Sequence, residues 1–314
     1  MKKRDLQIIL AIAMVIGVFP WLTGRNEYFI SLLVFMGING MITMGLSLLM
    51  GYAGQISLGH AAFFGLGAYS SGILTTHYSL PPLAAFFAGI LLSALVAYVV
   101  GKPTLRLKGH YMAVATLGFG EIMFILFNEL SSLTGGPSGL SGIPSLQFWG
   151  FPLEGTLYLY LVWGAVLFLL LFSLNVIDSR VGRALRAVHG SELAAGAMGV
   201  DASRYKVEVF VLSAVYASMG GSLYAHFINF ISPSSFSLMF SILLLMMVVV
   251  GGTETLWGAL LGAAVLTLLP EYLRGLADFE MLAYGAILMA VLLFMPQGIL
   301  EGVHRIWARS QGGS

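Results

Sequence analysis

Long apolar stretches separated by short polar breaks run along almost the whole chain, and this pattern predicts membrane-spanning helices. A helix that crosses a bilayer uses ~20 apolar residues. The positions of the breaks give ten candidate spans: 6–22, 28–50, 56–75, 83–100, 111–130, 157–176, 207–231, 236–250, 255–269 and 281–295. The predicted fold class is an all-α polytopic membrane protein with about ten transmembrane helices, and residues 1–314 form a single transmembrane domain.

The two longest stretches between spans differ in charge, and this difference predicts their sides of the membrane. Residues 131–156 are rich in Gly, Pro and Ser and contain no Lys or Arg, whereas residues 177–206 contain a basic cluster. Lys and Arg collect in cytoplasmic loops. With ten crossings and both termini in the cytoplasm, all of the 15 basic residues except Arg25 and Arg274 are cytoplasmic. Residues 131–156 then form an outer loop and residues 177–206 a cytoplasmic loop. Eight crossings would place the same loops on the same sides of the membrane and are the alternative.

The first apolar run follows three basic residues, as a secretory signal peptide does. Its A-x-A sequence, Ala11 to Ala13, lies inside the apolar run instead of after it. A cleavage site is expected after the run. The sequence therefore predicts a retained first helix.

Composition excludes several classes of protein. Charged residues make up 9% of the chain, against roughly 25% in soluble domains, and hydrophobic residues make up 58%. The chain has no Cys and a net charge of +1, which excludes disulfides and thiol chemistry and argues against a nucleic-acid partner. The Gly101-Lys102 pair precedes Pro103, so it is no P-loop. The histidines stand singly, without metal-ligand spacing. We expect no enzyme activity, metal or cofactor in this chain.

Two glycine-interrupted segments are candidates for a transport path. Residues 51–60 contain glycines together with Gln55, Ser57 and His60, and residues 250–257 contain glycines with Thr253 and Glu254. Backbone groups freed at such breaks cost several kcal/mol each in lipid, so the breaks must face protein or water. In transporters, interrupted helices often mark the substrate path. A tight turn with locally satisfied polar groups is the alternative.

Two further positions lie inside predicted spans. Glu121 is an ionisable residue in the middle of span 111–130, and such residues are commonly functional because burying them in a membrane is costly. A boundary position or a structural hydrogen bond is the alternative. Gly258 and Gly262 form a G-x-x-x-G pattern, which predicts close helix packing.

Residues 178–200 predict two short cytoplasmic helices. Ser179 can cap the first, which Gly190 ends, and Ser191 can cap the second, which Gly199 ends. Arg183 and Arg186 share one face of the first helix, and the second is built largely of small residues. A compact helix pair of this kind suits docking into a groove of another protein. A solvated connector is the alternative.

At these motifs the sequence resembles the LivM-type permease subunits of branched-chain amino acid ABC transporters. The resemblance is carried by residues 51–69 (GYAGQISLGHAAFFGLGAY), 105–122, 133–144, 180–204, 249–270 and 295–298. It implies that the E-x-A-A-x-x-x-G element is the loop that couples the permease to an ATPase. The coupling residues implied are Arg183, Arg186, Glu192, Ala194, Ala195 and Gly199. His189-Gly190 and Glu254 depart from the family pattern.

The resemblance also implies an importer-type ABC permease fold, partners and a substrate class. The expected assembly contains a second, LivH-like permease, two ATPase subunits that bind ATP and Mg, and an extracytoplasmic solute-binding protein, in a bacterial inner membrane. The implied substrate is a branched-chain amino acid, with Gln55, Ser57, His60, Glu121, Thr253 and Glu254 along the path. Import of urea, amides or another small solute, and an ion-coupled secondary transporter, are the alternatives.

Overall fold

The computed structural model describes residues 3–22, 24–107, 109–148 and 151–273, and single residues between 282 and 299. The long elements of this part are α-helices: α1 (Lys3–Leu22), α2 (Glu27–Ser47), α3 (His60–Thr76), α4 (Pro82–Thr104), α5 (His110–Glu129), α7 (Gly155–Asp178), α10 (Ala202–Ile228), α11 (Leu238–Gly251) and α12 (Leu256–Leu273).

The remaining elements of the described residues are short. They comprise three short α-helices, namely α6 (Ser131–Thr134), α8 (Arg180–Gly190) and α9 (Glu192–Ala197), the π-helix η1 (Leu48–Tyr52), the 3-10 helices η2 (Gly136–Ser138) and η3 (Pro233–Phe236), and the strands β1 (Leu140–Ser141), β2 (Gln147–Phe148), β3 (Phe151–Pro152) and β4 (Phe230–Ile231). The strands form two antiparallel pairs, β1 with β4 and β2 with β3.

The structure confirms a predominantly α-helical fold with apolar helices of membrane-spanning length. Within the described residues, α1, α2 with η1, α4, α5, α7 and α10 are long and apolar enough to cross a membrane, and α11 and α12 are shorter apolar helices. α3 begins at residue 60, so the predicted span 56–75 is wrong at its start, where residues 56–59 are not helical. The predicted span 281–295 lies largely outside the described residues. The total of ten crossings therefore stays a prediction.

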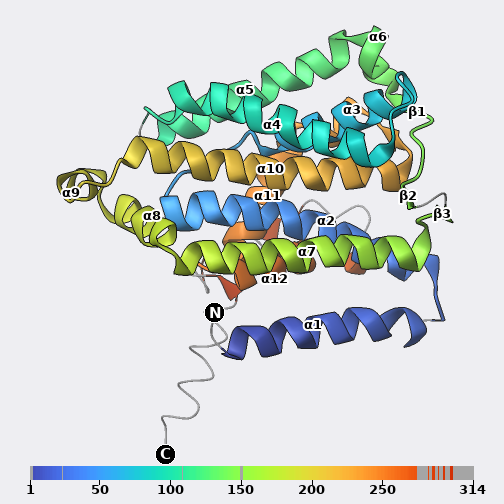
Figure 1. Ribbon diagram of the computed structural model, residues 1–314, viewed down its shortest axis with the longest axis horizontal. Helices are drawn as coiled ribbons and strands as arrows, with labels where there is room; N and C mark the ends of the chain where they lie inside the picture. Colours follow the sequence, from blue (N-terminus) through green and yellow to red (C-terminus); the bar gives the residue numbers. More distant parts are fainter. Residues whose placement is uncertain are drawn as a thin grey trace, which may run out of the picture.

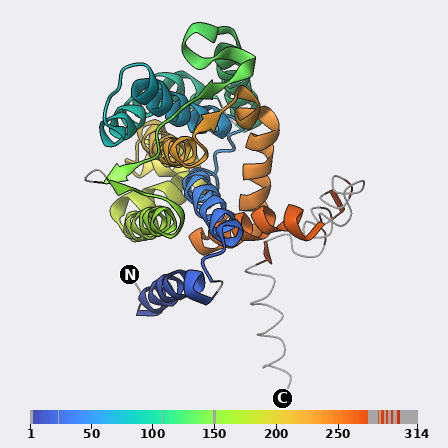
Figure 2. The same cartoon turned by 90° about the vertical axis from the view of Figure 1, so that its right-hand side faces the viewer.

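The helices α1, α2, α4, α5, α7 and α10 lie roughly side by side, with different structures at the two ends of the bundle (Figure 1), whereas α11 runs across their direction (Figure 2). One end carries α8 and α9, and we call it the coupling end. The opposite end carries β1–β3 and α6, and we call it the strand end. Viewed from the strand end, α2 and α10 lie inside the bundle, whereas α1 stands apart below it (Figure 2). α2 and α10 are accordingly mostly buried, while α1 and α5 are mostly exposed.

Glycines set the closest helix contacts. A Cβ at Gly67 of α3 would overlap the Ser218 carbonyl of α10, and a Cβ at Gly221 would overlap the Phe64 carbonyl. In the same way, a Cβ at Gly258 would lie 2.6 Å from the Gly251 oxygen, and one at Gly262 would overlap the Met247 carbonyl. Small residues allow this approach of helix backbones in a membrane. The packing role predicted for the G-x-x-x-G pattern is confirmed.

The predicted bounds 207–231 of one span are wrong at both ends. α10 begins at Ala202, because the Asp201 carboxylate accepts a hydrogen bond from the Arg204 amide (3.1 Å) and caps the helix. The helix ends at Ile228, because Asn229 takes a left-handed conformation with φ +59°. Residues 230–231 then form β4 instead of a further helical turn.

The loop at the strand end is tied to the end of α10. Strand β1 pairs with β4, the His226 Nδ1 donates to the Pro144 carbonyl (2.7 Å), and the Asn229 side-chain amide donates to the Ile143 carbonyl (2.8 Å). The stretch predicted as outer loop 131–156 is thus anchored against α10 along residues 140–144.

Candidate functional site

The two glycine-interrupted segments pack against each other at the coupling end. After α2 the chain continues through η1 and then runs without helix from Gln55 to Gly59. A Cβ at Gly51 would overlap the Thr253 carbonyl, and the Ser47 hydroxyl donates to that same carbonyl (3.2 Å). We call residues 48–59 the first break, residues 252–255 the second break, and the two together the paired break. A π-helix at such a point is frequent at functional sites.

The predicted polar residues of the first break are buried together. Ser57 and His60 are 0% and 1% exposed. His60 hydrogen-bonds the Ser57 hydroxyl through Nδ1 (2.9 Å) and the Ser213 hydroxyl of α10 through Nε2 (2.5 Å). The Gln55 side-chain amide donates to the Ala53 carbonyl (3.0 Å). In this conformation these groups are closed off from solvent.

Thr253 and Glu254 contact the first break at its π-helix. This contact is not at the polar residues Gln55, Ser57 and His60. The Thr253 carbonyl touches Ser47 and Gly51, and Glu254 Cα would lie 3.4 Å from a Cβ at Gly51. Thr253 is half-buried and Glu254 is exposed. The two breaks are therefore in contact through their backbones, and this contact does not bring their predicted polar side chains together.

Glu121 lies on α5, which packs against the same break. The Leu58 amide donates to the Thr116 hydroxyl (3.0 Å), and a Cβ at Gly120 would lie 3.5 Å from Gly59 Cα. Glu121 follows Gly120 and is half-buried. In the part of the chain that the structure describes, its carboxylate has no hydrogen bond or ion pair. It is a mid-helix acid at the level of the paired break.

Helix α8 lies directly on the first break. Ser179 caps it, as predicted, by accepting a hydrogen bond from the Val181 amide (3.1 Å). Near its other end, the His189 Nδ1 donates to the Gly51 carbonyl (2.9 Å), and a Cβ at Gly54 would lie 2.8 Å from His189 Cδ2. Gly54 has φ +67°, a conformation that suits glycine. Sequence reasoning noticed His189 as a departure from the family pattern but did not predict this contact.

Arg183 and Arg186 bind the chain's own backbone. Arg183 donates to the Asp178 carbonyl (3.3 Å) and Arg186 to the Ile177 carbonyl (3.2 Å). These carbonyls end α7, where cations are favourable because of the helix dipole. The two arginines therefore fix α8 at the end of α7.

Helix α9 presents two different faces. Ser191 caps it, and Gly199 follows it with φ +82°, as the sequence predicts. One face points into the chain: Glu192 forms an ion pair with Lys206, which is 2% exposed, and Ala195 is 4% exposed. The other face is open and apolar, with Leu193 83% and Met198 84% exposed and Ala194 and Gly199 also exposed. The six predicted coupling residues thus divide between internal attachment and open surface.

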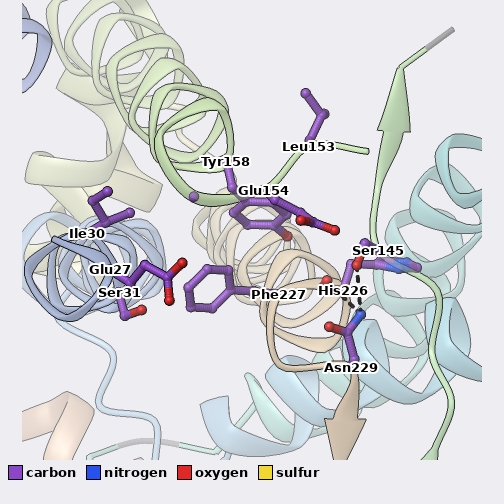
Figure 3. Close-up of a pocket in the computed structure, with 11 residues that line it drawn as sticks. Glu27, Ile30, Ser31, Ser145, Leu153, Glu154, Tyr158, His226, Phe227 and Asn229 are labelled. Carbon is purple, nitrogen blue, oxygen red and sulfur yellow. Dashed lines mark hydrogen bonds between the residues drawn. The ribbon is translucent and has the colours of Figure 1, made fainter. Parts of the chain in front are cut away.

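A pocket at the strand end was missed by the sequence analysis. It has a volume of about 240 Å³ and lies between the start of α2, the start of α7 and the end of α10 (Figure 3). Glu27 and Glu154 line it, both exposed, together with Tyr158, whose hydroxyl donates to the Leu223 carbonyl (2.5 Å). His226 also lines the pocket. Both of its ring nitrogens are hydrogen-bonded, Nε2 to the Ser71 hydroxyl and Nδ1 to the Pro144 carbonyl. Both carboxylates lie at helix amino ends, Glu27 in the first turn of α2 and Glu154 at the start of α7, where negative charge is favourable. The residues come from three distant segments, so no local motif marks them.

Among the described residues, no group of three or more His, Cys, Asp or Glu side chains is arranged to hold an ion.

Comparisons with known proteins agree on one family. Residues 28–296 match the family described as the permease component of the branched-chain amino acid transport system. The chain is 31% identical over 323 residues to the high-affinity branched-chain amino acid transport system permease protein LivM of Salmonella typhimurium, covering 95% of this chain and 75% of the relative. Identity to LivM of Escherichia coli is 30% over the same shares of the two chains. LivH of Salmonella typhimurium is 26% identical over 83% of this chain and 90% of the relative. No solved structure gives a significant match.

Proposed function

The chain belongs to the family of branched-chain amino acid transport permeases, and from this premise we propose that it is a permease subunit of an ATP-driven importer of branched-chain amino acids. The observation that supports an ATP-driven mechanism is the direct contact of α8 with the paired break, through His189 and Gly51. A movement imposed on α8 and α9 from outside the chain would reach the interrupted helices without an intermediate element.

The open face of α9 is the surface we assign to an ATPase subunit. Leu193 and Met198 are large apolar side chains that are almost fully exposed at the coupling end. Burial of such side chains stabilises an interface by about 1.5–3 kcal/mol each. Ala194 and Gly199 complete this surface, while Arg183, Arg186, Glu192 and Ala195 hold α8 and α9 to their own chain. ATP and Mg are bound by the ATPases and not by this chain.

The paired break is the segment we assign to the transport path. A passing amino acid is a zwitterion, and its charges need polar groups or water in place of bulk solvent. Gln55, Ser57 and His60 supply weak, uncharged polar groups, and weak binding permits release. Because they are buried in the present conformation, passage requires the break to open. Glu121, Thr253 and Glu254 then border the opened region from α5 and from the second break.

The proposed assembly includes a second, LivH-like permease, two ATPases and an extracytoplasmic solute-binding protein in a bacterial inner membrane. Uptake of radiolabelled leucine into proteoliposomes tests it, with the purified complex, ATP inside and the binding protein outside. We expect uptake only when both are present. Uptake that follows an ion gradient and ignores ATP would instead identify a secondary transporter, and uptake of urea or amides in place of leucine would reassign the substrate.

Cysteine labelling tests the proposed orientation, because the native chain has no Cys. Ser138 at the strand end and Ser203 at the coupling end are both exposed. In intact cells, Ser138→Cys should react with a membrane-impermeant maleimide and Ser203→Cys should not, because the basic coupling end is cytoplasmic. Both should react after permeabilisation. The reverse pattern in intact cells would refute the orientation.

Removal of the Ser57 hydroxyl tests whether the paired break belongs to the transport path. Ser57→Ala should lower leucine uptake about fivefold without changing the amount of assembled complex, since it removes a hydrogen bond worth ~1 kcal/mol from the buried polar group of the break. Ser173→Ala is the matched control, because Ser173 is equally buried and hydrogen-bonds the Tyr216 hydroxyl (2.8 Å) away from the break. Equal uptake by the two variants would remove Ser57 from the path.

A further inference from the structure

A groove opens between α4 and α10 at the coupling end, on the outside of the bundle. Its volume is about 630 Å³, and we call it the α4–α10 groove. α4 contributes Tyr98 and Lys102, and α10 and the residue before it contribute Asp201, Ser203, Arg204, Val207, Glu208 and Val211. The two helices lie next to each other in the bundle (Figure 1). None of these residues belongs to the paired break or to α9.

The lining of the groove changes from charged to apolar along the helix axes. On α10, the charged residues Arg204 and Glu208 lie in the first two turns, and Val211 lies about 4.5 Å beyond Glu208 at 1.5 Å per residue. On α4, which ends at Thr104, Tyr98 lies about 6 Å deeper than Lys102. Both helices therefore place charge at the coupling end and apolar surface toward the bundle centre. A phospholipid at a membrane surface has the same sequence of polarities.

The charged half offers groups of both signs. The Lys102 ammonium lies 5.7 Å from the centre of the Tyr98 ring, and in the described part of the chain it has no carboxylate partner. Arg204 donates through Nε to the Glu208 carboxylate (2.7 Å), and its side chain is 73% exposed, so its two terminal amino groups stay available. Ser203 adds an exposed hydroxyl beside the start of α10, where anions are favoured.

We propose that the α4–α10 groove binds one phospholipid whose headgroup carries a phosphate and a primary ammonium. Lys102, Arg204 and Ser203 contact the phosphate, and the Asp201 and Glu208 carboxylates contact the ammonium. Val211 and the Tyr98 ring pack against the upper part of an acyl chain, while Val207, which is 8% exposed, forms the floor of the groove. A free phosphate would leave the apolar half of the groove unused. A headgroup without an ammonium would add no cation beside the Asp201 and Glu208 carboxylates, which accept hydrogen bonds from the Arg204 amide and side chain.

Native mass spectrometry of the purified full chain tests this site. The delipidated protein is given equal amounts of phosphatidylethanolamine, phosphatidylcholine and phosphatidylglycerol with identical acyl chains. Phosphatidylcholine is the matched ligand, because its methylated ammonium cannot donate hydrogen bonds. We expect one phosphatidylethanolamine to be retained about fivefold more than either other lipid, since one net hydrogen bond contributes ~1 kcal/mol.

Three variants locate the binding to the groove. Lys102→Gln with Arg204→Gln should remove the preference, and Val211→Trp should reduce retention of all three lipids by filling the apolar half. Arg106→Gln is the control, because Arg106 is an exposed cation just beyond the same end of α4 and does not line the groove. Equal retention of the three lipids, a preference for phosphatidylglycerol, or an equal loss in the control would overturn the proposal. Loss of the retained lipid when the whole transporter assembles would assign the groove to the second permease instead.

Discussion

Uptake by a Glu192→Lys variant is expected to fall about 100-fold or more, because breaking a buried ion pair by removing one partner costs about 3–5 kcal/mol. Lys206 is 2% exposed, and Glu192 is its ion-pair partner. The substitution places a second ammonium group against the buried Lys206 ammonium. Their repulsion prevents α9 from packing against the start of α10. Transport assays in proteoliposomes measure the loss, and native mass spectrometry shows whether the chain is still folded.

A charge exchange distinguishes an internal attachment from a contact with the ATPase. In the double variant Glu192→Lys with Lys206→Glu, the pair is restored with its signs reversed. If the carboxylate acts within the chain, most of the uptake returns. If the carboxylate instead contacts the ATPase, the double variant stays as inactive as the single one, which would contradict the structural role.

The second large effect is expected at Gly51. A Cβ at this position would overlap the Thr253 carbonyl, which is backbone and cannot swing aside as a side chain can. Well-packed interiors resist such insertions, at a cost of typically 1–3 kcal/mol and more when backbone must move. Gly51→Ala should therefore separate the two halves of the paired break and lower uptake at least tenfold. Uptake per assembled complex, after size-exclusion chromatography, measures the effect.

Gly190→Ala is the control for this experiment. Gly190 ends α8 near the same break, and a Cβ there would meet no atom within 4 Å. Its uptake should match that of the unchanged chain. If Gly51→Ala transported normally as well, the close contact between the breaks would be irrelevant to transport.

Most of the helices could be predicted because their signal is local. The runs of apolar residues, the serines that cap α8 and α9, and the glycine at 199 are each visible within a few residues of sequence. The predicted bounds are wrong where a single polar residue determines the end of a helix. Asn229 stops α10 by adopting a left-handed conformation, and an apolar pair after it looked like a continued span.

The contacts of the candidate site could not be predicted, because they join distant segments. His189 meets Gly51 across 138 positions, and Ser213 meets His60 across 153. The sequence identified Ser57 and His60 as an unusual polar group in a membrane segment, but it contains no signal that they hydrogen-bond each other and α10. In the same way, Glu192 was predicted as a coupling residue without its partner Lys206, because the turn between α9 and α10 decides which charges meet.

The separate position of α1 bears on how this chain can diverge and be engineered. The family match begins at residue 28, after α1. The described contact between α1 and α7 includes a hydrogen bond from the Tyr160 hydroxyl to the Gly17 carbonyl (3.1 Å). Because the acceptor is a backbone carbonyl, a residue of any type at position 17 could accept this bond. A Cβ at Gly17 would meet no atom within 4 Å. Apart from Ile9 and Ile16, which are buried in the core, the sequence of α1 is therefore constrained by lipid more than by the bundle. Its exposed apolar residues can drift in evolution, and the helix is a natural place to attach a fused domain without altering the paired break.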